Sequence, residues 1–311
     1  MFTHLEQMVE KVQKSGPRRV VVVAAENELV LRSIKEAQKQ GLILPLLVGN
    51  GPEIETLATK VGINMNDARI VHVEMHSDAA TRGVELVSQG EADILMKGHL
   101  HTNTFLHAVL NKSAGLRTDR LLSHVFVLQV PMYHKLLGIT DAAINIHPTL
   151  MEKAEIIQNA VDMFRQLEIE KPKVAALSAV ETVNPKIPST LDAACLHKMA
   201  ERNQIKHAIV DGPLAFDNAI STEAAQEKRI ISDVAGDVDI VLAPDLDAGN
   251  ILYKNLQYLA NAQVAGIVMG AKVPIVITSR ADPPQARVFS LALANLVCIN
   301  GKGEACAPDL D

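Results

Sequence analysis

Residues 20–48 read VVVVAAENELVLRSIKEAQKQGLILPLLV, in which two apolar runs, Val20–Ala25 and Leu42–Val48, flank a helical pattern that is followed by Gly41. Glycine is the residue that a left-handed helix C-cap favours. Both apolar runs are nearly continuous rather than alternating, which is typical of strands covered on both faces. The stretch therefore predicts a strand–helix–strand unit of a parallel sheet.

The same alternation runs along the whole chain. Gly62 and Gly90 also follow helical patterns, and Thr149 followed by Glu152 predicts a capping box at a helix start. Repeated units of this kind predict an α/β fold with parallel sheets, helices on both faces and ligands at the carboxyl ends of strands. We expect the further strands at Arg69–Val73, Ile94–Met96, Val125–Val130, Ala142–Ile146, Val174–Leu177, His207–Val210, Ile240–Leu242 and Val273–Thr278.

Length and composition favour a two-domain protein that acts on small molecules. The 311 residues exceed what one ordinary core supports. The chain has a net charge of −6, 3% aromatic residues and no Trp. This composition disfavours binding to nucleic acid or to an anionic membrane, which needs positive charge or stacking side chains. No stretch approaches the roughly 20 apolar residues of a membrane span. Scattered cysteines, Cys195, Cys298 and Cys306, are typical of reduced thiols, so we expect a cytoplasmic protein.

Polar residues follow four of the expected strands, and the first such place is Val273–Asp282, which reads V-P-I-V-I-T-S-R-A-D. Ser279, Arg280 and Asp282 stand at a strand-to-helix turn, where a hydroxyl, a guanidinium and helix amides can bind an anion. The alternative is that Asp282 only caps the next helix, with Pro283 at its first position.

The second place is Pro244–Leu256, P-D-L-D-A-G-N-I-L-Y-K-N-L. A glycine lets a ligand approach the backbone, and an asparagine offers both a donor and an acceptor. The alternative is an ordinary helix start capped by Asp247. The candidate binding residues are Gly249, Asn250, Tyr253 and Lys254.

The third place is Met96–Leu110, where Lys97 closes a strand and Thr102 precedes a helix, so that an anion can rest on free helix amides. His99 and His101 form an H-x-H pair, which is a weak metal signal without a third ligand. The fourth place is Val210–Ser221, which contains Asp211 and whose composition also fits an ordinary turn.

Missing motifs narrow the chemistry. No G-x-G-x-x-G opens the first strand–helix unit, where Val23–Glu28 reads V-A-A-E-N-E, and no G-x-x-x-x-G-K-[ST] occurs. A dinucleotide fingerprint and a P-loop are therefore absent. The remaining class of chemistry is group transfer in which the protein positions the reactants and supplies charge.

Taken together, these segments resemble the phosphate acetyl/butyryltransferase family, most closely its butyryltransferase branch. The resemblance extends from about residue 20 to about residue 300. It is carried by K-G-x-x-x-T at Lys97–Thr102, G-L-R-T-D-R-L-L-S-H-V at Gly115–Val125, T-D-A-A-I-N-I-x-P at Thr140–Pro148, V-E-x-V-N-P-K at Val180–Lys186, V-D-G-P-L-A-F-D-N-A at Val210–Ala219, A-G-N-I-L-Y-K at Ala248–Lys254 and P-I-V-I-T-S-R-A-D at Pro274–Asp282.

The resemblance implies two three-layer αβα domains with a cleft between them, similar to isocitrate/isopropylmalate dehydrogenases. Residues 1–120 with 271–311 would form one domain and residues 121–270 the other. It also implies that acyl-CoA and phosphate are converted to acyl phosphate and CoA in a ternary complex. Coenzyme A is then a substrate, with no metal or other cofactor, and the enzyme is expected to be a homo-oligomer.

Residue by residue, Ser279 and Arg280 match the Ser-Arg pair that holds phosphate and the developing oxyanion. Asp282 is the acid that would take the thiol proton, because Ala286 stands where the acetyl branch carries its catalytic Asp. Leu106 stands where acetyl-type members carry a substrate-binding Arg. The expected substrate- and CoA-binding residues are Lys97, Thr102, Asp211, Gly249, Asn250, Tyr253 and Lys254.

Other functions stay open from the sequence. One is a phosphate acetyltransferase with acetyl-CoA as its main substrate. Another is an acyl-carrier-protein:phosphate acyltransferase, which we expect to carry a membrane-facing apolar helix. A metal- and NAD-dependent hydroxy-acid dehydrogenase could use the same fold, and a non-catalytic CoA-binding protein could retain it.

Overall fold

The computed structural model describes residues 2–111, 115–279 and 282–300. The chain divides into two compact α/β units. We call Glu6–Arg120 with Ala265–Asp311 the terminal unit, and Met1–Leu5 with Leu121–Val264 the middle unit.

The terminal unit is built on strands in the order β3-β2-β1-β4-β11-β10. β1 to β4 are parallel where they pair, and β11 is parallel to β4. β10 runs antiparallel to β11, so the sheet is mixed rather than parallel throughout. The strands are β1 (Arg18–Val23), β2 (Ile43–Gly49), β3 (Arg69–His72), β4 (Ile94–Lys97), β10 (Gln263–Met269) and β11 (Ile275–Val276).

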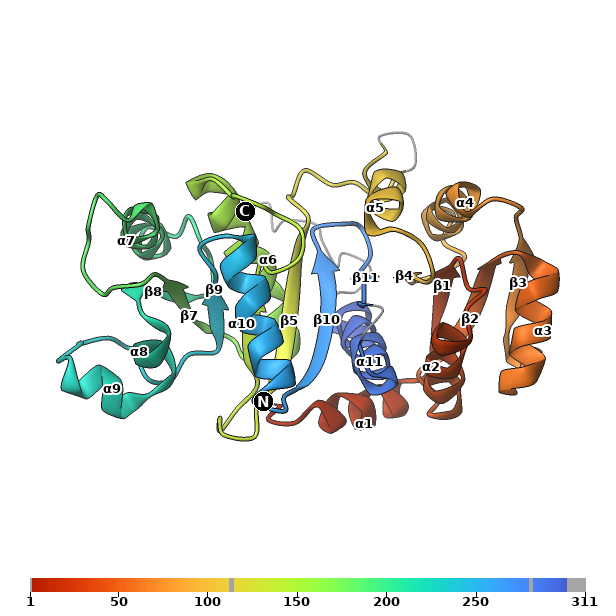
Figure 1. The fold of residues 1–311 in the computed structure, drawn as a ribbon, viewed down its shortest axis with the longest axis horizontal. Coiled ribbons are helices and arrows are strands. Elements are labelled where there is room, and N and C mark those ends of the chain that lie inside the picture. The colour runs from red at the N-terminus through yellow and green to blue at the C-terminus, as the bar shows by residue number, and fades with distance from the viewer. Residues whose placement is uncertain (1, 112–114, 280–281, 301–311) are drawn as a thin grey trace. The chain divides into compact units, whose positions relative to one another are not determined.

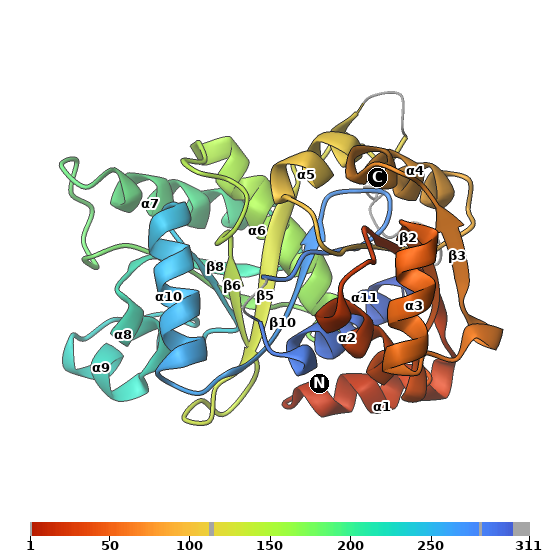
Figure 2. The same ribbon diagram turned by 45° about the vertical axis from the view of Figure 1, so that its right-hand side comes forward.

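Helices cover both faces of these strands. α4 lies so close to β1 that a Cβ atom on Gly83 would stand 2.4 Å from Cγ2 of Val23. Figures 1 and 2 show α4 and α5 on one side of the strands, and α2 and α11, which pack together, on the other. The helices are α1 (Leu5–Ser15), α2 (Glu28–Lys39), α3 (Gly51–Val61), the 3-10 turn η1 (Met65–Asp67), α4 (His76–Ser88), α5 (Thr102–Leu110) and α11 (Pro284–Asn300).

The middle unit has strands in the order β5-β6-β9-β7-β8. β6, β9, β7 and β8 are parallel, and β5 runs antiparallel to β6. The strands are β5 (Ser123–Gln129), β6 (Leu137–Thr140), β7 (Lys173–Leu177), β8 (Ile209–Leu214) and β9 (Ile240–Leu242). The helices are α6 (Leu150–Gln166), α7 (Pro188–Glu201), α8 (Phe216–Ile220), α9 (Thr222–Glu227) and α10 (Leu246–Tyr258).

Alternating residues of the middle sheet face two different helix layers, as period-two side chains require. A Cβ atom on Gly138 would stand 2.7 Å from the ring of Phe164 in α6. The neighbouring residue of β6, Ile139, belongs instead to the apolar cluster that contains Tyr253 of α10. The nearly continuous apolar strands of the sequence are therefore explained by burial on both faces.

Two strand predictions need correction. Ala142–Ile146 is not a strand, because the Asp141 carboxylate accepts hydrogen bonds from the backbone N–H groups of Ala143, Ile144 and Asn145 at 2.9–3.2 Å and bends the chain into a turn. The strand here is β6, which ends one residue before Asp141. β10 was not predicted, because Ala and Gly weaken the strand pattern at its centre.

Helix punctuation follows the prediction. Thr149 and Glu152 form a capping box at the start of α6. Gly41, Gly62 and Gly90 have φ angles of 69°, 81° and 75°, the left-handed conformation expected after a helix.

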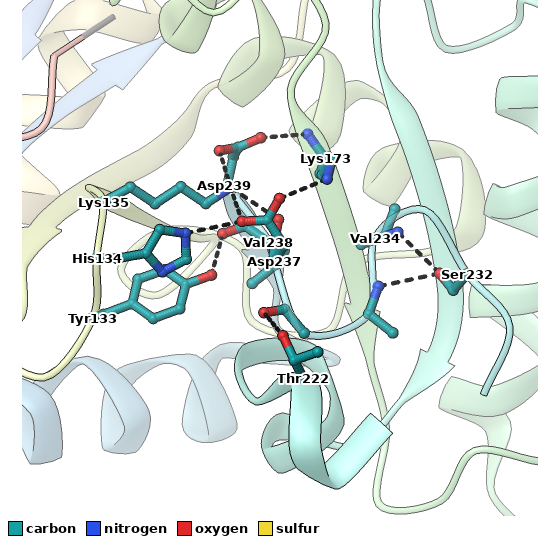
Figure 3. A network of polar contacts seen from close by, with 12 residues as sticks. Tyr133, His134, Lys135, Lys173, Thr222, Ser232, Val234, Asp237, Val238 and Asp239 are labelled. Atoms are coloured by element: carbon teal, nitrogen blue, oxygen red, sulfur yellow. Dashed lines mark hydrogen bonds and ion pairs between the residues drawn. The ribbon is translucent and has the colours of Figure 1, made fainter. Parts of the chain in front are cut away.

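The amino ends of β6, β7 and β9 are joined by an ion-pair network (Figure 3). Lys135, buried, lies 2.7 Å from Asp239 and 2.9 Å from Asp237, and Lys173 lies 2.6 Å from Asp237. Burial acts to raise the pKa of Asp237, but hydrogen bonds from Lys173 and Lys135 outweigh it and hold the pKa well below its ordinary value. Burial and the charges of Asp237 and Asp239 raise the pKa of Tyr133. Because every described charge here has a partner, the network ties strands together.

Candidate active site

The carboxyl ends of three strands in the terminal unit surround a pocket of about 160 Å³. Residues after β1, β4 and β11 form its walls, together with one side chain from α11. This is the edge of an α/β sheet at which ligands bind. The lining residues are Asn27, Leu29, Val30, Lys97, Gly98, His99, Thr278, Ser279 and Arg287.

Gly98 allows the loop after β4 to lie directly on the end of β1. Its N–H donates to the carbonyl oxygen of Val23 at 2.8 Å, and the N–H of His99 donates to that of Ala24 at 2.8 Å. A Cβ atom on Gly98 would stand 2.4 Å from both carbonyl oxygens. The glycine of the predicted Lys-Gly pair is therefore required by this close contact, whatever ligand binds.

Lys97 brings a buried positive charge to the pocket. It is 6% exposed, and its Nζ atom donates to the carbonyl oxygens of Leu100 at 3.0 Å and Gly98 at 3.3 Å. A buried ammonium group is tolerated when it is hydrogen-bonded. Its charge makes this wall of the pocket favourable for an anion.

The wall formed by the start of α2 is part polar and part apolar. Asn27 caps the helix by accepting from the N–H of Val30 at 3.1 Å, and its side-chain nitrogen lies 3.4 Å from Nδ1 of His99. Leu29 is 53% exposed although it is a large apolar residue. Among the described residues, no group of three or more His, Cys, Asp or Glu side chains is arranged to hold a metal ion, and His99 and His101 have no such third partner there.

Ser279 and Asp282 are held in one turn after β11. The N–H of Ser279 donates to Oδ2 of Asp282 at 2.6 Å, and the N–H of Asp282 donates to the carbonyl oxygen of Ser279 at 3.3 Å. The capping interpretation of Asp282 needs correction, because α11 begins at Pro284 and this carboxylate oxygen turns back to Ser279. Arg280, the third predicted residue of the turn, lies outside the described residues.

Arg287 was not predicted, although it lines this pocket. It stands in a mostly apolar helix, where no neighbouring motif distinguishes it from the helix pattern. Asn27 and Leu29 were missed as well. The loop after β1 has no glycine motif, and its position at a strand end is the signal that could have identified these two residues. Thr102 begins α5 and is half-buried, but it is not among the residues that line the pocket.

In the middle unit, Gly249 and Asn250 support the turn that follows β6. The side-chain nitrogen of Asn250 donates to the carbonyl oxygen of Ala142 at 3.1 Å. The helix start is capped by Asp245, which accepts from the N–H of Ala248 at 2.9 Å. The predicted cap at Asp247 is therefore wrong by two residues.

Three further predicted residues of the middle unit have different surroundings. Tyr253 is 4% exposed, and its ring stacks on Phe126 with centroids 3.9 Å apart. Lys254, the next residue of α10, is exposed. Asp211 lies within β8, where Oδ1 accepts from the N–H of Gly212 at 2.8 Å and lies 3.4 Å from Nδ1 of His197.

Sequence comparison assigns the chain to a family. A family model described as "Phosphate acetyl/butaryl transferase" matches residues 66–295, which include most of the pocket and the whole turn after β11. The chain belongs to this family of transferases. The resemblance seen in its motifs is thereby confirmed.

Relatives of this phosphate acetyl/butyryltransferase family member include proteins named phosphate butyryltransferase and proteins named phosphate acetyltransferase. It is 45% identical to the phosphate butyryltransferase of Clostridium acetobutylicum over 300 residues, covering 96% of this chain and 100% of that protein. It is 48% identical to the phosphate acetyltransferase of Rickettsia felis over 281 residues, covering 90% and 80%. The crystal structure of a branched-chain phosphotransacylase from Enterococcus faecalis is similar with a TM-score of 0.79 and 33% identity, covering 90% and 99%.

The resemblance implied that Asp282 replaces an acid that the acetyl branch carries at the place of Ala286, and the structure locates both residues. Ala286 is 4% exposed in the first turn of α11, whereas Asp282 lies in the turn beside Ser279. Within the described part of the turn, Asp282 is thus the carboxylate that contacts Ser279. No helix in the described part of the chain is long and apolar enough to cross a membrane.

Proposed function

We propose that this transferase interconverts short-chain acyl-CoA plus phosphate and acyl phosphate plus CoA, by direct attack in a ternary complex. Family membership favours this reaction over a dehydrogenase or a non-catalytic CoA-binding protein. The observation that carries the proposal is the placement of Ser279 and Lys97 on one pocket, with Asp282 hydrogen-bonded to Ser279.

The proposed roles follow from the chemistry of each group. In the direction of acyl-CoA synthesis, the CoA thiol loses its proton as sulfur attacks the acyl carbonyl, and phosphate leaves with the bonding electrons. A thiol with a pKa of roughly 8.5 needs a base for this step, and we assign that role to Asp282. The Ser279 hydroxyl can donate to the developing oxyanion, and Lys97 and Arg280 supply positive charge for the phosphate.

We propose that Lys254, an exposed cation on α10, contacts the phosphate groups of CoA, and that Thr102 and Asp211 contribute polar contacts. Gly249, Asn250 and Tyr253 are proposed to act by shaping the middle unit, as their contacts with Asp141, Ala142 and Phe126 support.

The finer architecture is also a proposal. Helices on both faces of the strands in each unit support two three-layer αβα domains of the isocitrate/isopropylmalate dehydrogenase type. We further propose that the enzyme needs no metal or nicotinamide and works in the cytoplasm as a homo-oligomer. The missing dinucleotide motif supports the statement on nicotinamide, and the scattered cysteines support a cytoplasmic location. The homo-oligomer is supported by the fact that most oligomers are symmetric homo-oligomers.

The test is phosphate-dependent release of CoA thiol from acetyl-, butyryl- and isobutyryl-CoA, with EDTA present and no nicotinamide. Asp282→Asn separates two roles of the carboxylate, because the amide keeps an oxygen that can accept from the N–H of Ser279 but is not a base. We expect it to lower kcat by roughly 100-fold or more. Ser279→Ala is expected to lower kcat by a similar factor.

Ser15→Ala, at the exposed end of α1, is the control and is expected to behave as the unmodified enzyme. The absence of release from all three thioesters would refute the proposed reaction. The ratio of rates among the three distinguishes a butyryltransferase from an acetyltransferase, which the relatives leave open.

A further inference from the structure

The guanidinium group of Arg287 reaches the active-site turn on both sides of residues 280 and 281. Before them, Nη2 donates to the carbonyl oxygen of Ser279 at 3.1 Å, and Nε donates to Oγ1 of Thr278 at 3.2 Å. After them, Nη1 makes a longer contact of 3.4 Å with the carbonyl oxygen of Asp282. One side chain of α11 therefore contacts both ends of the turn.

These contacts converge on the atoms that orient Ser279. Its carbonyl oxygen accepts from Arg287 and from the N–H of Asp282, while its own N–H donates to the Asp282 carboxylate. A planar guanidinium offers several donors in a fixed fork, so it can hold several acceptors at once. A flexible lysine ammonium offers no such fork.

Arg287 is only 4% exposed, and burial of a charged group is costly unless the group is hydrogen-bonded. Burial lowers the pKa of Arg287, while the charge of Asp282 opposes that shift. An arginine stays protonated in proteins, so a positive charge is retained beside the pocket. An apolar residue at this place in α11 would cost less to desolvate. It could not, however, make the hydrogen bonds to the turn that the arginine makes.

We propose that Arg287 is a positioning residue of the transferase: it holds the turn so that the Ser279 hydroxyl and the Asp282 carboxylate have fixed places relative to the reacting acyl group. This proposal rests on the proposed function. It assigns to Arg287 no contact with phosphate or CoA. Displacement of a reacting group by about 1 Å can cost on the order of 100-fold in rate.

The kinetic test compares Arg287→Gln and Arg287→Lys with the unmodified enzyme. We expect Arg287→Gln to lower kcat about 100-fold while KM for phosphate changes by less than about 3-fold. Arg287→Lys keeps the charge without the fork and is expected to recover only part of kcat. Arg82→Gln removes a half-buried arginine whose carboxylate partner is Glu85 and serves as the matched control.

Two results would overturn the proposal. One is an unchanged kcat in Arg287→Gln. The other is a loss confined to a higher KM for phosphate, which would make Arg287 a phosphate ligand. Thermal melting of each variant identifies any that fail to fold. If Arg287→Gln fails to fold, Arg287→Lys carries the test, because it keeps the buried positive charge and loses only the planar fork of donors.

Hydrogen exchange at the amides of Ser279 and Asp282 tests the same proposal without activity. Both N–H groups donate within the turn, so we expect their exchange to accelerate about 10-fold in Arg287→Gln and to stay unchanged in Arg82→Gln. Equal exchange in Arg287→Gln and the unmodified enzyme would refute the positioning role. If the unmodified enzyme released no CoA, the proposed function would fail while the exchange experiment still decided whether Arg287 holds the turn.

Discussion

Gly249 lies so close to Asp141 that a Cβ atom on Gly249 would stand 2.7 Å from the carbonyl oxygen of Asp141. The contact joins α10 to the turn after β6, and the Asn250 side chain reinforces it by donating to Ala142. The oxygen belongs to the backbone of the buried residue Asp141, so it cannot move aside as a flexible side chain would.

We therefore expect Gly249→Ala to lower the free energy of unfolding by about 1–3 kcal/mol, even though alanine is the better helix former. Urea denaturation of the full chain measures the change. Asn255→Ala, at an exposed position of the same helix, should change stability by less than about 0.5 kcal/mol. A Gly249→Ala protein as stable as the unmodified one would show that the helix and the turn can separate at little cost.

Leu29 is expected to influence which acyl chain the transferase accepts. Its side chain is apolar, 53% exposed, and lines the same pocket as Ser279. Loss of methylene contacts in an apolar pocket weakens discrimination by roughly 10-fold or more. We expect Leu29→Ala to lower kcat/KM for butyryl-CoA about 10-fold relative to acetyl-CoA. Leu191→Ala, at a comparably exposed leucine of the middle unit, should leave the ratio as it was. An unchanged ratio in Leu29→Ala would place the acyl chain elsewhere.

Asp237 is expected to stabilise the middle unit in a pH-dependent way. The charged groups that face it are Lys135 and Lys173 at 2.6–2.9 Å, and the imidazole of His134 lies 3.0 Å away. Because its pKa is lower in the folded chain than in the unfolded chain, its contribution is complete above about pH 4 and is lost as the pH falls further. We expect Asp237→Asn to reduce the free energy of unfolding by about 1–2 kcal/mol at pH 7, since the carboxylate is partly exposed.

The difference between this variant and the unmodified protein should shrink in urea titrations below about pH 4. Glu55→Gln, at an exposed position of α3, controls for the general loss of one negative charge. A difference that stayed constant down to acid pH would mean that Asp237 acts through packing rather than through its charge.

The capping box of α6 gives a prediction that depends on local structure alone. Thr149 accepts from the N–H of Glu152 at 3.4 Å, and the Glu152 carboxylate accepts from the N–H of Thr149 at 2.7 Å. We expect Thr149→Ala to cost about 1 kcal/mol of stability in thermal or urea unfolding, and Thr149→Ser to cost much less. If serine and alanine had the same effect, the cap would contribute nothing through its hydroxyl.

Prediction succeeded where the signal is local. A run of β-branched residues predicts a buried strand such as β1. A helix end such as that at Gly62 requires a residue that tolerates a positive φ angle. It failed at Ala142–Ile146, where strand propensity lost to the Asp141 carboxylate capturing three backbone N–H groups. The capping alternative for Asp282 also failed, because α11 begins at Pro284 and an oxygen of this carboxylate accepts from the N–H of Ser279.

The sequence by itself determined the α/β alternation, the residues at the strand ends and, through its motifs, the transferase family. Those features depend on residues that are neighbours in the sequence, because secondary-structure propensity, helix capping and turn chemistry act over a few positions. The tertiary structure decided that Asn27, Lys97 and Ser279 share one pocket and that Arg287 holds both ends of the turn. Such contacts join positions far apart in the chain, and they are set by how parallel strands pair and helices pack on them rather than by any property of the residues in isolation.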